Sequence, residues 1–195
     1  MNLSRLSLTS PMKFQWKIKN DIEISGKVVL SDRGQQSIEL LQHLNPAMIG
    51  NVIAIDPGKN FGMAEIWKPF YGTEYSITLH NGVLDDSKYP LREVAYWFIQ
   101  HYVDNVGHKL DLAIVEGASY GDRFGQVKLA EVRCGFSLGL SEKGIPVTIV
   151  APKTPRKAVF GNGNIGAWDV WTTLDHNAAD ALCLALYPFY REGAK

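Results

Sequence analysis

Residues 51–66, NVIAIDPGKNFGMAEI, decide the fold of this chain. The small and β-branched run at residues 52–55 predicts a buried strand, and the apolar run at residues 61–67 predicts a second strand. Asp56 directly follows the first of these strands. Ending a buried strand on a carboxylate costs free energy unless a cation meets it. We therefore expect Asp56 to face a metal ion or a phosphate-bound cation.

The sequence beyond this segment continues as strands and helices. Periodicity predicts strands over residues 51–55, 62–67, 75–83, 110–115 and 146–150, and helices over residues 91–106, 125–140 and 177–187. Short connections between the first three strands indicate antiparallel hairpins, whereas intervening helices make the later strands parallel. The prediction is an α/β fold, a mixed five-stranded sheet with flanking helices.

Residues 1–47 differ from the rest of the chain in their pattern of apolar and charged residues. Apolar and lysine residues alternate over residues 13–19 and a second β-rich run follows Asn20-Asp21, which predicts a β-hairpin with one basic face. The spacing of Ile38, Leu41 and Leu44 predicts a short helix. We expect residues 1–47 to be an N-terminal appendage, and residues 48–195 to be the main domain.

The composition bounds the classes of function. The 195 residues carry no net formal charge, so any contact with nucleic acid has to come from local patches. Cys134 and Cys183 lie in apolar helical patterns, which predicts buried free thiols and a reducing compartment. No secretory leader and no apolar run of membrane-spanning length occur in the sequence. We expect a soluble cytoplasmic protein with no membrane partner.

Three acidic residues stand out by their positions. Asp56 and Glu116 each end a predicted buried strand, and Asp180 lies among alanines on the last predicted helix. Each of them alone fits a structural role, as a turn cap or as the partner of a lysine. Together they predict a metal site, because converging carboxylates in a low dielectric cannot all ionise without cations. Mg²⁺ suits oxygen ligands, and two such ions can clamp a phosphodiester.

Four motifs occur in a fixed order, IAIDPG at residues 53–58, LAIVEG at 112–117, APKTPRKAVFGNG at 151–163 and DHNAADALCLAL at 175–186. In these motifs the chain resembles the RuvC-type Holliday junction resolvases, metal-dependent nucleases of the ribonuclease H-like superfamily.

The resemblance covers about residues 51–187. It implies a ribonuclease H-like fold, a homodimer, and cleavage of four-way (Holliday) or branched DNA. It further implies that Asp56, Glu116 and Asp180 bind Mg²⁺, with Mn²⁺ as a substitute, and act in catalysis.

The last motif departs from the family pattern. Asn177 stands where the family usually carries an acid or a histidine. Its amide oxygen can bind Mg²⁺ but brings no charge, and Asn177 is a candidate catalytic residue. His176, four residues before Asp180, is a candidate ligand or general base. Asp175 is better placed as the helix N-cap than as a ligand. Trp168 replaces a basic residue that is typical of the family.

Six residues are candidates for contacts with DNA. They are Tyr120, Arg123, Phe124, Lys153, Arg156 and Lys157. The first three belong to the segment after Glu116 and could touch the backbone or wedge into an opened junction, or could form a surface loop with an aromatic lid. The last three could bind phosphates without reading bases, or could form a solvated basic turn.

The interpretation that fits these features best is a structure-selective endodeoxyribonuclease. One alternative is a nuclease of the same fold that acts on another structured nucleic acid. A second alternative is a junction-binding protein with weakened catalysis, which the amide at Asn177 favours. A third is an ATPase of the actin or sugar-kinase class, which the short chain and the lack of a second glycine-rich phosphate loop disfavour. A phage, organelle or bacterial origin stays open.

Overall fold

The computed structural model describes residues 12–18, 22–30, 36–40, 50–68, 75–118, 123–171 and 174–191. The strands are β1 (Met12–Ile18), β2 (Ile22–Leu30), β3 (Gln36–Leu40), β4 (Val52–Asp56), β5 (Asn60–Trp67), β6 (Ser76–Val83), β7 (Leu112–Glu116) and β8 (Val147–Val150). The helices are α1 (Leu91–Asn105), α2 (Arg123–Glu142), α3 (Lys153–Phe160), α4 (Ala167–Val170) and α5 (His176–Arg191).

The predicted five-stranded sheet is confirmed as the order β6-β5-β4-β7-β8. β4, β5 and β6 pair antiparallel through short connections, while β7 pairs parallel with β4 and β8 parallel with β7. β4 lies in the interior of the sheet, and its residues 52–55 are fully buried. A near-continuous apolar run is what a strand covered on both faces requires.

The N-terminal strands extend the same sheet beyond β6. β1 and β2 form the predicted hairpin, and β3 pairs antiparallel with both β2 and β6, so the sheet has eight strands. The predicted helix from Ile38 onward is wrong for residues 36–40, which form β3. Ile38 and Leu40 also fit the two-residue period of a strand, and β6 would otherwise present unpaired backbone groups. Residues 41–47 lie outside the described residues, and the boundary at residue 47 stays a prediction.

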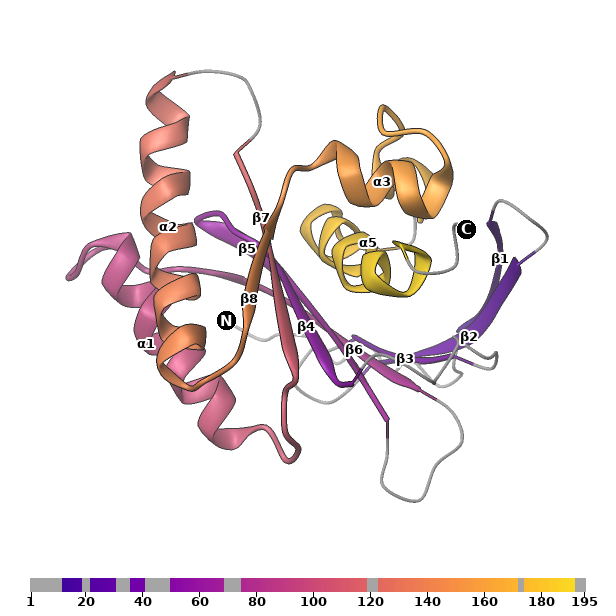
Figure 1. Ribbon diagram of the computed structural model, residues 1–195, viewed down its shortest axis with the longest axis horizontal. Coiled ribbons are helices and arrows are strands. Elements are labelled where there is room, and N and C mark those ends of the chain that lie inside the picture. Colours follow the sequence, from indigo (N-terminus) through magenta and orange to yellow (C-terminus); the bar gives the residue numbers. More distant parts are fainter. Residues whose placement is uncertain are drawn as a thin grey trace, which may run out of the picture.

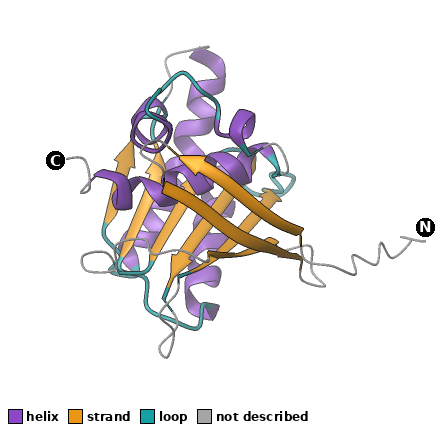
Figure 2. Cartoon of the chain, turned by 90° about the vertical axis from the view of Figure 1, so that its right-hand side faces the viewer, coloured by secondary structure: helices purple, strands orange, loops and turns teal. Residues whose placement is uncertain are grey.

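Helices cover both faces of the sheet, with α1 and α2 on one side and α3 and α5 on the other (Figure 1). Each face has its own apolar core. Ile53, Ile55 and Met63 belong to the core under α1 and α2, whereas Ala54 and Ala64 belong to the core under α5. Figure 2 shows the strands crossing between these two layers as one twisted sheet. α5 is the more deeply buried layer, because the small residues along it allow close contact with the sheet.

The packing of α2 against α1 uses two glycines four residues apart. A Cβ at Gly135 would lie 2.2 Å from the backbone oxygen of Arg92, and one at Gly139 would lie 2.4 Å from Ile99 Cγ2. The two glycines therefore serve contact within the chain. The expectation of two buried thiols is only half right, because Cys183 is buried whereas Cys134 is exposed on α2. Within the described part of the chain, no helix has the length and apolar character needed to span a membrane.

Candidate active site

Asp56 and Glu116 end neighbouring parallel strands on the same face of the sheet. Ile55 pairs with Val115, so the next residues, Asp56 and Glu116, occupy adjacent positions at the carboxyl edge. Side chains alternate along a strand. Ile55 and Val115 point into the core under α1 and α2, and the two carboxylates therefore point to the opposite face, toward α5.

The start of α5 reaches this edge because β5 carries a glycine there. Gly62 pairs with Asp56 across the β4–β5 ladder. A Cβ at Gly62 would lie 2.0 Å from the backbone oxygen of Asn177, so no larger residue fits beneath the first turn of α5. Asp180 follows less than one turn later and is only 6% exposed. Gly62 thus lets the helix bring Asp180 to the two strand-end carboxylates.

Asp56 and Glu116 have raised pKa values. Burial raises the pKa of Asp56 to about 7, and repulsion from Asp180 adds to the rise, while His176 and Arg156 oppose it. Burial raises the pKa of Glu116 to about 8, and both Asp56 and Asp180 raise it further. Mutual repulsion of this kind shows that the three groups share one electrostatic site. It also means that the site lacks compensating positive charge for three ionised carboxylates.

One cation of the chain already meets this site. Arg156 on α3 donates from Nη2 to Asp180 Oδ1 at 2.8 Å, and its side chain is 24% exposed. The sequence prediction treated Arg156 as a phosphate contact and missed this pairing. As they stand, no three His, Cys, Asp or Glu side chains of the described ranges are arranged to hold a metal ion. Carboxylate oxygens are the donors that suit a hard cation, and one oxygen of Asp180 is paired with Arg156.

The first turn of α5 assigns separate roles to its polar residues. Asp175 Oδ1 accepts hydrogen bonds from the backbone N–H groups of Asn177, at 3.0 Å, and Ala178, at 3.3 Å. This is N-cap geometry, as the sequence predicts for Asp175. His176 is mostly exposed and its Nδ1 lies 3.7 Å from Asp180 Oδ2. His176 is therefore within reach of the carboxylate site, and Asn177 is half-buried beside it.

The backbone of Glu116 is fixed by two contacts that the sequence prediction missed. Arg133 of α2 donates from Nε to the carbonyl oxygen of Glu116 at 2.7 Å. The N–H of Gly117 donates to the carbonyl oxygen of Val150 at 2.7 Å. Arg133 also lowers the pKa of Glu116 through its charge. An arginine in the apolar pattern of a helix was the available signal for this contact.

Five of the six candidate DNA-binding residues belong to α2 or α3. Lys153 and Lys157 are exposed on α3, the helix that carries Arg156. Arg123 and Phe124 form the beginning of α2, and only their backbone is described. Tyr120 lies outside the described residues. The structure thus brings the lysines to the helix beside the site, and their contact with DNA stays a prediction.

No protein-family model matches the sequence. No curated protein matches it either. Solved structures do match. The Thermus thermophilus RuvC structure is 22% identical, with a TM-score of 0.55 over 73% of this chain and 96% of that chain. The structure of T. thermophilus RuvC in complex with Holliday junction substrate is 19% identical, with a TM-score of 0.58 over 73% of this chain and 94% of that chain. These likenesses show that the chain has a RuvC-like, ribonuclease H-like fold.

Proposed function

We propose that this chain is a metal-dependent, structure-selective endodeoxyribonuclease that hydrolyses phosphodiesters in four-way or otherwise branched DNA. The observation that carries the proposal is the meeting of Asp56, Glu116 and Asp180 at one edge of the sheet, where each adds repulsion to another. Gathering one buried and two half-buried acids costs free energy unless a cation or a catalytic role offsets it. The fold shared with RuvC supports the same interpretation.

The three carboxylates would hold Mg²⁺, or Mn²⁺ in its place. When bound, such an ion supplies positive charge that activates water and neutralises charge developing on the phosphate. Asp180 would turn from Arg156 to help hold the ion, and the guanidinium would then be available to the substrate. Arginine binds phosphate oxygens through two parallel hydrogen bonds, which orients the scissile group. Arg156 thus compensates Asp180 in the free protein and binds phosphate in the complex.

Residues around the carboxylates complete the proposed site. His176 is exposed and close to Asp180, so it can accept a proton from the attacking water. Asn177 offers an amide oxygen at the same helix end. Lys153 and Lys157 on α3 contact neighbouring phosphates and hold the strand in register.

The substrate and assembly belong to the proposal as well. One similar structure is that of T. thermophilus RuvC with a Holliday junction substrate. By analogy, a homodimer of this chain binds a junction and presents two carboxylate sites to two strands, with Tyr120, Arg123 and Phe124 at the opened junction. A cytoplasmic location is part of the same proposal.

Cleavage of labelled DNA tests the proposed activity. Wild type should cut a four-way junction in Mg²⁺ and leave linear duplex intact, and three-way DNA and a structured RNA test the breadth of the substrate class. Asp56→Asn should abolish cutting while junction binding persists. The matched control is Asp175→Asn, which makes the same change from carboxylate to amide at a residue outside the three proposed metal ligands. Asparagine also caps helices, so the N-cap of α5 is kept. Equal cutting by wild type and Asp56→Asn would refute the proposed role of Asp56.

A junction-binding protein without catalysis is the second candidate. The pairing of Asp180 with Arg156 and the amide at Asn177 favour it, because both reduce the negative charge available to a metal. Tight junction binding with no cleavage in either Mg²⁺ or Mn²⁺ would establish this candidate instead.

A further inference from the structure

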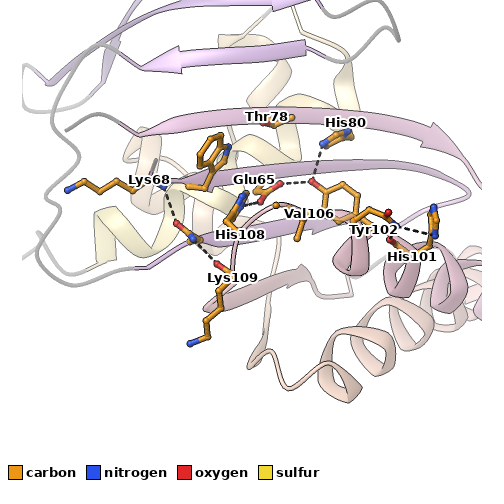
Figure 3. A pocket seen from close by; sticks show the side chains of 13 residues that line it. Glu65, Lys68, Thr78, His80, His101, Tyr102, Val106, His108 and Lys109 are labelled. Atoms are coloured by element: carbon orange, nitrogen blue, oxygen red, sulfur yellow. Dashed lines mark hydrogen bonds and ion pairs between the residues drawn. The ribbon is translucent and has the colours of Figure 1, made fainter. Parts of the chain in front are cut away.

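A groove of about 970 Å³ opens on the sheet face that carries α1. It is lined by β5, β6, the end of α1 and the loop that follows α1 (Figure 3). Glu65, at its base, pairs in register with Ile53, three residues before Asp56, and its side chain lies on the opposite face from the carboxylate site. The groove is therefore separate from the candidate active site.

A buried carboxylate orders one wall of this groove. Glu65 is only 2% exposed, although its neighbours along this face of β5 are apolar. Tyr102 donates from Oη to Glu65 Oε2 at 2.5 Å, and His108 Nε2 forms an ion pair with Glu65 Oε1. Tyr102 Oη also lies 3.2 Å from His80 Nε2. In Figure 3 these side chains point toward one another, so Glu65 fixes the rings of Tyr102 and His108.

The wall combines a pair of stacked rings with cationic groups. The ring of His108 stacks on Trp67 with centroids 4.8 Å apart and an angle of 16° between the planes. Lys68 and Lys109 also line the groove, and the side chain of Lys109 is 86% exposed. Lys109 lies 3.1 Å from Asp111, whereas no ion pair of Lys68 occurs within the described ranges. The site thus offers a held ring pair next to positive charge.

We propose that this groove binds a nucleotide, with the base against the Trp67–His108 pair and the phosphate near Lys68 and Lys109. Aromatic rings beside a basic groove are how proteins bind unpaired nucleotides, because every base has a face that stacks. The volume lies in the range of small-molecule sites. The nucleotide is either a free nucleoside phosphate or an unpaired residue of a DNA strand. Only the second source rests on the proposed function.

Binding of single-stranded DNA tests this site without any cleavage. Full-length Asp56→Asn in EDTA is titrated into a fluorescein-labelled oligothymidylate, and anisotropy gives the dissociation constant. Trp67→Ala should weaken binding about 5- to 150-fold, since stacking of a base on an aromatic ring contributes about 1–3 kcal/mol. The double change Lys68→Glu and Lys109→Glu should weaken it at least as much. Matched controls are Trp97→Ala and Lys88→Glu, both at exposed positions outside the groove.

Further arms separate the sources and the possible failures. Thymidine monophosphate that competes with the oligonucleotide identifies a free nucleotide as a ligand, whereas competition only by unlabelled oligonucleotide identifies a strand. Trp67→Phe should retain binding, which distinguishes stacking from a general loss of fold. The proposal is overturned if the groove variants bind like the controls. Junction cleavage by wild type is measured separately. The nuclease proposal can therefore be confirmed while the groove proposal is refuted, and the groove proposal can be confirmed while the nuclease proposal is refuted.

Discussion

Raising the pH in the absence of metal ions should destabilise this fold. The pKa of Asp56 rises from 3.8 to about 7 in the folded protein, and that of Glu116 rises from 4.5 to about 8. Because both folded values exceed the unfolded ones, the stabilisation is complete below about pH 4, is lost progressively as the pH rises, and is gone once the pH has passed through 7 and 8. At 1.36 kcal/mol for each pKa unit, the two units between pH 5 and the folded pKa of about 7 correspond to about 3 kcal/mol at Asp56 alone. For a chain of this length, that loss lowers the melting temperature by about 10 °C.

Thermal denaturation in EDTA between pH 5 and pH 9, followed by circular dichroism at constant ionic strength, measures this effect. Asp56→Asn removes the charge, so it should melt above wild type at pH 9 and close to wild type at pH 5. Mg²⁺ at pH 9 should raise the melting temperature of wild type and not that of the variant.

The matched control is Asp111→Asn. The pKa of Asp111 is lowered, chiefly by the backbone N–H of Asn51, so its substitution should bring no gain at pH 9. If wild type melts at the same temperature at pH 5 and pH 9, and Asp56→Asn is no more stable than wild type at pH 9, then the ionised carboxylate of Asp56 does not destabilise the fold.

Three further substitutions test the parts of the site. Arg156→Gln leaves the buried carboxylate of Asp180 without its cation. The free energy of unfolding, measured by urea denaturation, should fall by about 3 kcal/mol, and Mg²⁺ should restore part of it. Unchanged stability would show that the Arg156–Asp180 pair does not stabilise the fold. Gly62→Ala places a Cβ 2.0 Å from the backbone oxygen of Asn177. The variant should therefore lose about 2 kcal/mol of stability in thermal denaturation and should no longer cleave junctions. Full activity would show that Gly62 is not required for the close packing of α5. Asp175→Ala removes the N-cap of α5 and should lower the free energy of unfolding by about 1 kcal/mol, while cleavage persists. Loss of cleavage in a folded variant would indicate that Asp175 is a metal ligand.

Most of the sheet and its covering helices could be predicted from periodicity. The runs that form β4, β5 and β7 are mostly apolar, and α1 and α2 repeat apolar residues at helical spacing. The local sequence pattern therefore predicts the same elements that tertiary packing requires. The segment at β3 was predicted wrongly because its apolar residues fit both periods, and the choice depends on pairing with the edge of β6. That edge is a property of the assembled sheet rather than of the segment.

The candidate site was predictable in part for a similar reason. The positions of the strand-end acids Asp56 and Glu116 can be predicted from the sequence, because parallel strands bring their carboxyl ends to one edge of the sheet. Long-range contacts carry no such local signal. Neither the approach of α5 over Gly62 nor the pairing of Arg156 with Asp180 follows from spacing along the chain. The groove around Glu65 was not predicted from the sequence, because a single acidic residue within a strand is usually expected to face solvent.

A crystal structure of the protein soaked in Mn²⁺, with anomalous differences collected at the manganese edge, would show whether the three carboxylates bind a metal ion. We expect an anomalous peak bonded to carboxylate oxygens of Asp56, Glu116 and Asp180, with Asp180 turned from Arg156. A map without a peak at this edge of the sheet, in crystals where Asp180 still holds Arg156, would contradict it.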